Sequence, residues 1–138
     1  MIDYSTLKYF KRAEFVCSAS NDRAEMDADF VHTLERIREK LGRPMIISSA
    51  YRSDDHPITK AKIAKGAANG GAHHLGLAVD IHCAGFLAMN IISLALNEAT
   101  INGIGVNQKG AWNSRFVHID AVPKDNNADI TRPAIWSY

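Results

Sequence analysis

Two short apolar segments of the sequence carry aspartate and histidine at alternating positions. In LGLAVDIH the polar residues are Asp80 and His82, and in FVHID they are His118 and Asp120. Because successive side chains of a β-strand point to opposite faces, each segment would bury one apolar face and present an imidazole and a carboxylate on the other. If the two strands are neighbours in a sheet, these four polar groups converge.

A further histidine, His73, precedes the first of these strands in a glycine-flanked turn. Zinc accepts mixed nitrogen and oxygen ligands, and catalytic zinc sites use three protein ligands and leave a fourth position to water. Such a water becomes a nucleophile near neutral pH, while the metal polarises a scissile carbonyl. The set His73, Asp80 and His118 therefore predicts a catalytic zinc site. Spacing alone leaves other combinations of the six histidines open, and manganese or cobalt would accept the same ligands.

The elements that must position these residues follow from hydrophobic periodicity and from chain breakers. A helix is predicted over residues 27–41, capped by Asp27, with apolar residues at three- and four-residue steps, namely Phe30, Leu34, Ile37 and Leu41. Residues 44–53 predict a strand with Arg52 near its end. Residues 54–71 predict a long connection without regular structure, because Pro57 and three glycines interrupt it.

The second half of the chain predicts a strand over 75–82, an apolar helix over 86–99, a strand over 101–106 and a last strand over 116–122. The tail, residues 125–138, is expected to wrap across the surface with Trp136 packed down. This order of elements predicts an α+β fold, in which a small, mainly antiparallel sheet is flanked by helices.

Bulk composition limits the classes of function. A chain of 138 residues predicts one domain over residues 1–138. A formal net charge of +1, from 16 basic and 15 acidic residues, argues against a broad nucleic-acid or anionic-membrane surface. Without an apolar run of membrane-spanning length or a leader-like start, we expect synthesis as a soluble cytosolic product without membrane insertion. Cys17 and Cys83 are expected to be reduced core residues.

Four strings in the sequence, ISSAYRS, HHLGLAVDI, GIGV and FVHID, resemble the zinc D-alanyl-D-alanine carboxypeptidase family. This family includes phage L-alanyl-D-glutamate peptidases and shares a fold with the hedgehog signalling domain. Its pattern S-x-H-x-x-G-x-A-x-D matches from His73 to Asp80, and His118 corresponds to the later ligand histidine. The resemblance covers about residues 10–120, and the segment YFKRAEFVCS is similar to the compact phage-type branch. It implies a hedgehog-like fold and a zinc cofactor held by these three residues.

The resemblance also implies a role for Arg52, because family members place an arginine beside the zinc to bind a substrate carbonyl or carboxylate. Its guanidinium would neutralise a developing oxyanion opposite the metal. The structural alternative is an arginine that pairs with Asp54 or Asp55 at the surface. His74 is outside the ligand register and is expected to be a partly exposed loop histidine.

Two positions depart from the family pattern. Gly71 stands where the family has serine, and Arg115 stands where the best-known members carry an acidic general base three residues before the last histidine. Asp120 is the leading substitute base, since it shares a face with His118, and it could equally orient that histidine. His82 is the reserve candidate for base or proton shuttle, and it could instead be a polar residue at the rim of the sheet.

The resemblance implies a zinc metallopeptidase that hydrolyses peptide bonds in the stem peptides of bacterial peptidoglycan. It would be either a D-Ala-D-Ala carboxypeptidase or an L-Ala-D-Glu endopeptidase, acting on the cell wall after release or as part of a phage particle. The alternative is a non-catalytic, zinc-containing virion or wall-binding module, which the departure at Arg115 motivates. The sequence leaves the oligomeric state open.

Overall fold

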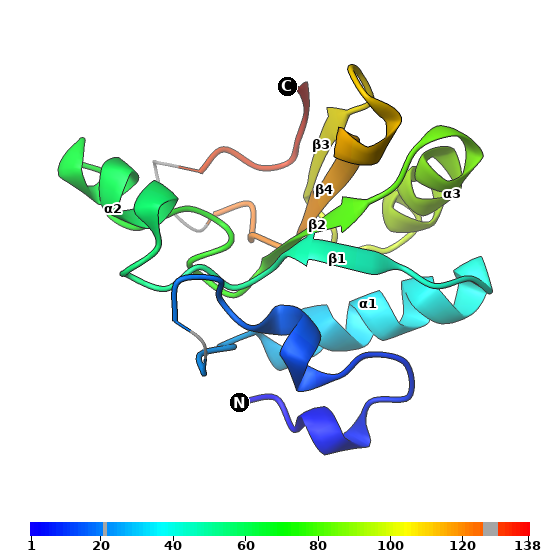
Figure 1. Ribbon diagram of the computed structural model, residues 1–138, viewed down its shortest axis with the longest axis horizontal. Coiled ribbons are helices and arrows are strands. Elements are labelled where there is room, and N and C mark those ends of the chain that lie inside the picture. The colour runs from blue at the N-terminus through cyan, green and yellow to red at the C-terminus, as the bar shows by residue number, and fades with distance from the viewer. Residues whose placement is uncertain (21, 126–129) are drawn as a thin grey trace.

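The computed structural model describes residues 1–20, 22–125 and 130–138. Its centre is a five-stranded sheet with the strand order β1-β2-β4-β3-β5 (Figure 1). The strands are β1 (Ile46–Ser49), β2 (Ala78–His82), β3 (Gly103–Asn107), β4 (Phe116–Asp120) and β5 (Ala134–Ser137). The first four strands in the sheet order pair antiparallel, and β5 joins β3 in parallel. This arrangement confirms the predicted α+β fold.

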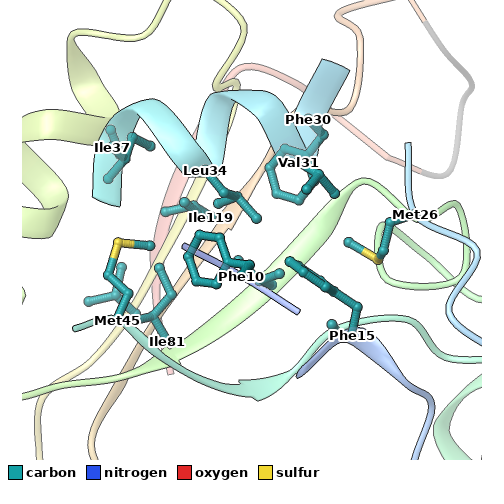
Figure 2. Packing of buried hydrophobic residues seen from close by; sticks show 14 of the residues in the cluster. Phe10, Phe15, Met26, Phe30, Val31, Leu34, Ile37, Met45, Ile81 and Ile119 are labelled. Carbon is teal, nitrogen blue, oxygen red and sulfur yellow. The ribbon is translucent and has the colours of Figure 1, made fainter. Parts of the chain in front are cut away.

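Two helices, α1 (Ala28–Leu41) and α3 (Gly85–Leu96), pack beside each other and cover the apolar side of the sheet. The α1 helix begins where the Asp27 carboxylate accepts a hydrogen bond from the Phe30 N–H, and it ends at Gly42 in the left-handed conformation. Its buried face includes Leu34 and Ile37, which pack with sheet residues such as Ile81 and Ile119 in one core (Figure 2), and all four side chains are fully buried. Burial of each such side chain stabilises the fold by about 1.5–3 kcal/mol.

A third helix, α2 (Pro57–Ala64), lies in the segment that was predicted to be irregular, so that part of the prediction is wrong. Pro57 does not interrupt this helix because it occupies the first turn, where its fixed φ suits the helix and its missing N–H is not needed. The side chain of His56 caps the helix by accepting a hydrogen bond from the Ile58 N–H at 3.2 Å. The helix projects to one side of the sheet (Figure 1).

The predicted tail contains a strand, β5, so FVHIDAV is not the last strand of the sheet. Without β5, the outer edge of β3 would carry unpaired backbone N–H and C=O groups, and pairing with β5 satisfies them. Trp136 on β5 does pack down, with its ring centroid 5.1 Å from that of His118. Residues 126–129 of the tail lie outside the described residues.

Cys17 and Cys83 are both free and buried, as predicted. Within the described ranges, no helix has the length and apolar content needed to cross a membrane.

Candidate metal centre

The pairing of β2 with β4 brings Asp80 directly opposite His118 in the antiparallel register. Their neighbours Val79, Ile81, Val117 and Ile119 are fully buried on the helix-covered side of the sheet, so Asp80 and His118 share the opposite face. His73 reaches the same point from the turn that precedes β2. The three residues offer ligand atoms that all lie within 4.8 Å of one another.

The distances between these ligand atoms suit a zinc ion. The Oδ1 atom of Asp80 lies 3.3 Å from Nε2 of His73 and 3.0 Å from Nδ1 of His118. A tetrahedral zinc with bonds of about 2.0–2.1 Å separates its ligand atoms by about 3.3 Å. The side chains are only 7, 12 and 6% exposed for His73, Asp80 and His118, so little rearrangement or solvent competition opposes binding. Two imidazoles and one carboxylate therefore fit zinc in both spacing and chemistry.

The second ring nitrogen of each histidine is hydrogen-bonded in a way that selects the tautomer. Nδ1 of His73 lies 2.7 Å from the carbonyl oxygen of Ala50, and Nε2 of His118 lies 2.8 Å from the carboxylate of Asp120. Since the Ala50 carbonyl and the Asp120 carboxylate both accept, each of these nitrogens can keep its proton while the opposite nitrogen binds a metal. Once a cation displaces any proton shared with Asp80, the opposite nitrogen of each ring would offer its lone pair to the metal.

The electrostatic surroundings keep both carboxylates ionised. Burial alone would raise the pKa of Asp80, but hydrogen bonds from His118 and His73 hold that pKa well below its usual range. Burial likewise opposes ionisation of Asp120, and hydrogen bonds from His118 and Arg132 outweigh it, lowering the pKa of Asp120 to about 2. Burial also lowers the pKa of His73, so its imidazole is neutral at neutral pH.

His118 differs from His73 because two carboxylates flank its ring. Burial disfavours its imidazolium, yet hydrogen bonds to Asp120 and Asp80 raise the pKa of His118 above its ordinary value. A divalent cation must therefore displace any proton held on Nδ1 of this ring. Binding of the cation is expected to weaken as the pH falls.

Asp120 contacts the His118 ring on the side away from Asp80, and solvent does not reach it. Its side chain is fully buried, and its two oxygens accept hydrogen bonds from Nε and Nη2 of Arg132 at 2.9 and 2.6 Å. The Val122 N–H donates to the same carboxylate at 3.2 Å. With the His118 bond, every direction around this carboxylate is used, so Asp120 holds the ring and does not face the solvent.

Arg52 reaches the three-residue group from just beyond β1, which ends at Ser49 and not at Arg52. Its Nη2 atom lies 3.1 Å from Oδ2 of Asp80, and its Nε–H donates to Ser49 Oγ at 3.2 Å. Asp54 and Asp55, the surface partners considered from the sequence, pair instead with His74 at 2.8 Å and with Lys60 at 3.9 Å. Arg52 therefore lies beside the group, on the oxygen of Asp80 that faces away from the histidines.

Two other residues singled out from the sequence lie elsewhere. His82, at the end of β2, lines a separate hollow with Arg43, Phe86 and Trp112. Arg115 donates to the carbonyl oxygen of Gly110 at 3.0 and 3.2 Å and stacks over the Trp112 ring at 5.2 Å. Neither residue lines the cavity at His73, Asp80 and His118.

That cavity has a volume of about 500 Å³. Besides the three candidate ligands it is lined by Arg52, Ile58, Lys62, Ala72, Phe116, Arg132, Trp136 and Tyr138. Ile58 and Lys62 come from α2, and the last three come from the tail, so five lining residues belong to segments for which the sequence predicted no role at the site. Apart from Asp80, no carboxylate of the described residues lines this cavity.

Two glycines of β3 indicate that residues of the tail lie over this face of the sheet. Gly103 and Gly105 lie opposite Asp120 and His118 in the register of β3 with β4. A side chain at Gly105 would place its Cβ 2.7 Å from the Trp136 ring, and one at Gly103 would collide with the Asp120 carboxylate. Glycine at alternate positions of a strand indicates that bulky groups lie over that face, and here those groups are Trp136 and the Asp120–Arg132 pair.

Comparison with known proteins agrees with this geometry. A search of curated proteins returns no match to the chain. The family model described as Peptidase M15 matches residues 8–120, a range that includes β1 to β4, Arg52 and the three candidate ligands. The matched range covers most of the sequence, and the chain belongs to the Peptidase M15 family.

Proposed function

We propose that this chain is a zinc-dependent peptidase that hydrolyses peptide bonds in the stem peptides of bacterial peptidoglycan, as a D-Ala-D-Ala carboxypeptidase or an L-Ala-D-Glu endopeptidase. The observation that carries the proposal is the convergence of His73, Asp80 and His118, with the outer nitrogen of each ring bonded to an acceptor and the inner nitrogen directed at Asp80. Membership of a peptidase family supports the reaction class.

The proposed ligands are Nε2 of His73, an oxygen of Asp80 and Nδ1 of His118. A zinc ion held there would supply a Lewis acid and acidify a water molecule. Arg52 keeps N–H groups beyond those bonded to Asp80 and Ser49, since a guanidinium carries five. We assign these donors to the substrate carbonyl, where they would stabilise negative charge that develops on its oxygen.

Asp120 is proposed as a positioning residue for His118. Its carboxylate has no free lone pair directed into the cavity, and Arg132 neutralises it, so a role as general base would require both contacts to break. We leave His82 outside the mechanism, because it lines a different hollow.

The second candidate function is a zinc-containing wall-binding or virion module without turnover. One observation favours it: within the described ranges, the cavity presents no carboxylate beyond Asp80 that could act as a base. Arg115 stands at the position of the usual acidic base, and its guanidinium contacts the Gly110 carbonyl and the Trp112 ring.

The deciding experiment is to load the purified protein with one equivalent of zinc and incubate it with defined muropeptides. Hydrolysis is followed by the appearance of new amino groups and by mass spectrometry, which identifies the bond that is cut. His118→Ala is the inactive control, and His32→Ala, on the exposed side of α1, is the matched control. Wall binding without any hydrolysis, under all metals tested, would establish the non-catalytic module instead.

A further inference from the structure

The side chain of Lys62 reaches into the wall of the cavity from α2. Lys62 lines both the metal-site cavity and an adjoining hollow of about 330 Å³, together with Ala72 and Arg132. Lys62 therefore borders both spaces.

Gly71 makes room for the ammonium group of Lys62. A Cβ atom built on Gly71 would lie 2.6 Å from Nζ of Lys62, closer than any real contact allows. Gly71 also has a φ of 92°, a conformation that side chains rarely adopt. The ammonium group of Lys62 therefore lies in the space that a side chain at position 71 would fill.

The charges around the cavity are unequal. Of its three cationic side chains, Arg52 pairs with Asp80 at 3.1 Å and Arg132 pairs with Asp120 at 2.6 Å. Lys62 has no carboxylate partner among the described residues, although Lys60 on the same helix lies 3.9 Å from Asp55. A metal ion would add further positive charge, so the cavity favours an anionic group beside Lys62.

Lys62 is exposed to solvent, yet its surroundings make its charge less favourable than in free solution. Partial burial lowers the pKa of Lys62, and the positive charges of Arg52 and Arg132 lower it further. An anion that entered the cavity would gain a charge-assisted hydrogen bond and relieve this repulsion. A neutral amide at the same place would do neither.

We propose that Lys62 is a specificity-determining residue that binds a carboxylate of the substrate next to the metal site. The inference rests on the proposed function for the class of substrate, a stem peptide. Such peptides carry free carboxylates at the C-terminus and on the D-glutamate residue, and either could be the group bound. Amidation of that group would remove the charge that Lys62 recognises.

The test uses γ-D-glutamyl-L-lysine, which contains both kinds of carboxylate but neither scissile bond. Four forms are prepared, with each carboxylate either free or amidated, and binding to the zinc-loaded protein is measured by NMR titration. The parent is expected to bind the acid about tenfold more tightly than the amide at one of the two positions. That position identifies the source of the carboxylate.

Three variants complete the experiment. Lys62→Gln is expected to abolish the acid preference at that position, and Lys62→Arg is expected to keep most of it. Lys65→Gln, at the end of the same helix and outside both cavities, is the matched control and should behave as the parent. The inference is overturned if the parent binds none of the forms, if it binds acids and amides alike, or if Lys62→Gln retains the preference.

These outcomes are separate from the proposed function, because they measure binding and not turnover. A parent that hydrolyses muropeptides without a Lys62-dependent acid preference would refute the specificity role alone. A parent with the acid preference but no hydrolysis of any muropeptide would refute the peptidase and retain the carboxylate site.

Discussion

The Nε2 atom of His118 lies 2.8 Å from Oδ2 of Asp120, two residues further along the same strand. Side chains at i and i+2 of a strand share a face, so this contact is built into β4. The carboxylate fixes the ring with Nδ1 directed at Asp80, and Arg132 closes the far side of Asp120.

Replacement of Asp120 by asparagine is expected to weaken zinc binding by about 10- to 100-fold, because the His118 ring loses the acceptor that sets its tautomer and orientation. Competition with a chromophoric chelator measures the change. Glu39→Asn, on the exposed side of α1, is the control and should bind zinc as the parent does. Equal affinities for the parent and Asp120→Asn would exclude the positioning role.

Metal-free protein is expected to lose stability in acid between about pH 4 and pH 2. The folded-state pKa of Asp120, about 2, is below its ordinary unfolded value of about 3.9, so the stabilisation is present above pH 4 and is lost as the pH falls through the folded pKa. The difference between the two pKa values corresponds to about 2–3 kcal/mol in the free energy of unfolding. Urea unfolding at several pH values measures it, and Asp120→Asn should show a flatter pH dependence.

Zinc is expected to stabilise the folded chain, since the three ligands are assembled only in the native sheet. At a free zinc concentration of one hundred times Kd, mass action adds about 2.7 kcal/mol to the free energy of unfolding. Thermal unfolding with and without a chelator measures the shift in Tm. His118→Ala should abolish the shift, whereas His32→Ala should preserve it. A Tm that does not respond to zinc in the parent would argue against the site.

Replacement of Arg52 by alanine is expected to lower kcat/KM on the cleaved muropeptide by about 10²- to 10³-fold, the cost of removing one donor to a developing oxyanion. Zinc stoichiometry, measured in parallel, separates this effect from loosening of Asp80. Arg52→Lys should recover only part of the rate, because an ammonium cannot bridge Asp80 and substrate as a guanidinium can. A variant with full zinc and unchanged kcat/KM would remove Arg52 from the mechanism.

Gly105→Ala is expected to destabilise the fold by about 1–3 kcal/mol, since the added Cβ would lie 2.7 Å from the Trp136 ring. Chemical denaturation measures the loss. Combining it with Trp136→Ala should cost less than the sum of the two single changes, because the small side chain then has room. Additive costs would show that Trp136 does not lie over Gly105 in solution.

The local pattern of the sequence was sufficient to place Asp80 and His118 on the polar faces of their own strands, because alternation has a period of two and the apolar residues beside them must be buried. The antiparallel pairing of β2 with β4 makes these a single face. The resemblance fixed the ligand register, which selects His73 and not His74 as the candidate ligand. The α1 helix was also predictable, since its spacing, cap and terminal glycine all lie within one segment.

The tertiary structure alone decided what surrounds those candidate ligands. Parallel pairing of β5 with β3 brings Arg132, Trp136 and Tyr138 over the cavity across about 30 residues of chain, and no local periodicity encodes such a pairing. The contact between Lys62 on α2 and Gly71 also joins separate parts of the chain, so local periodicity does not encode it either. Alternation also predicted that His82 shares a face with Asp80. His82 lies two residues further along β2, however, and it lines another hollow. Sequence period determines which face a side chain occupies, whereas contacts between distant segments determine what it meets there.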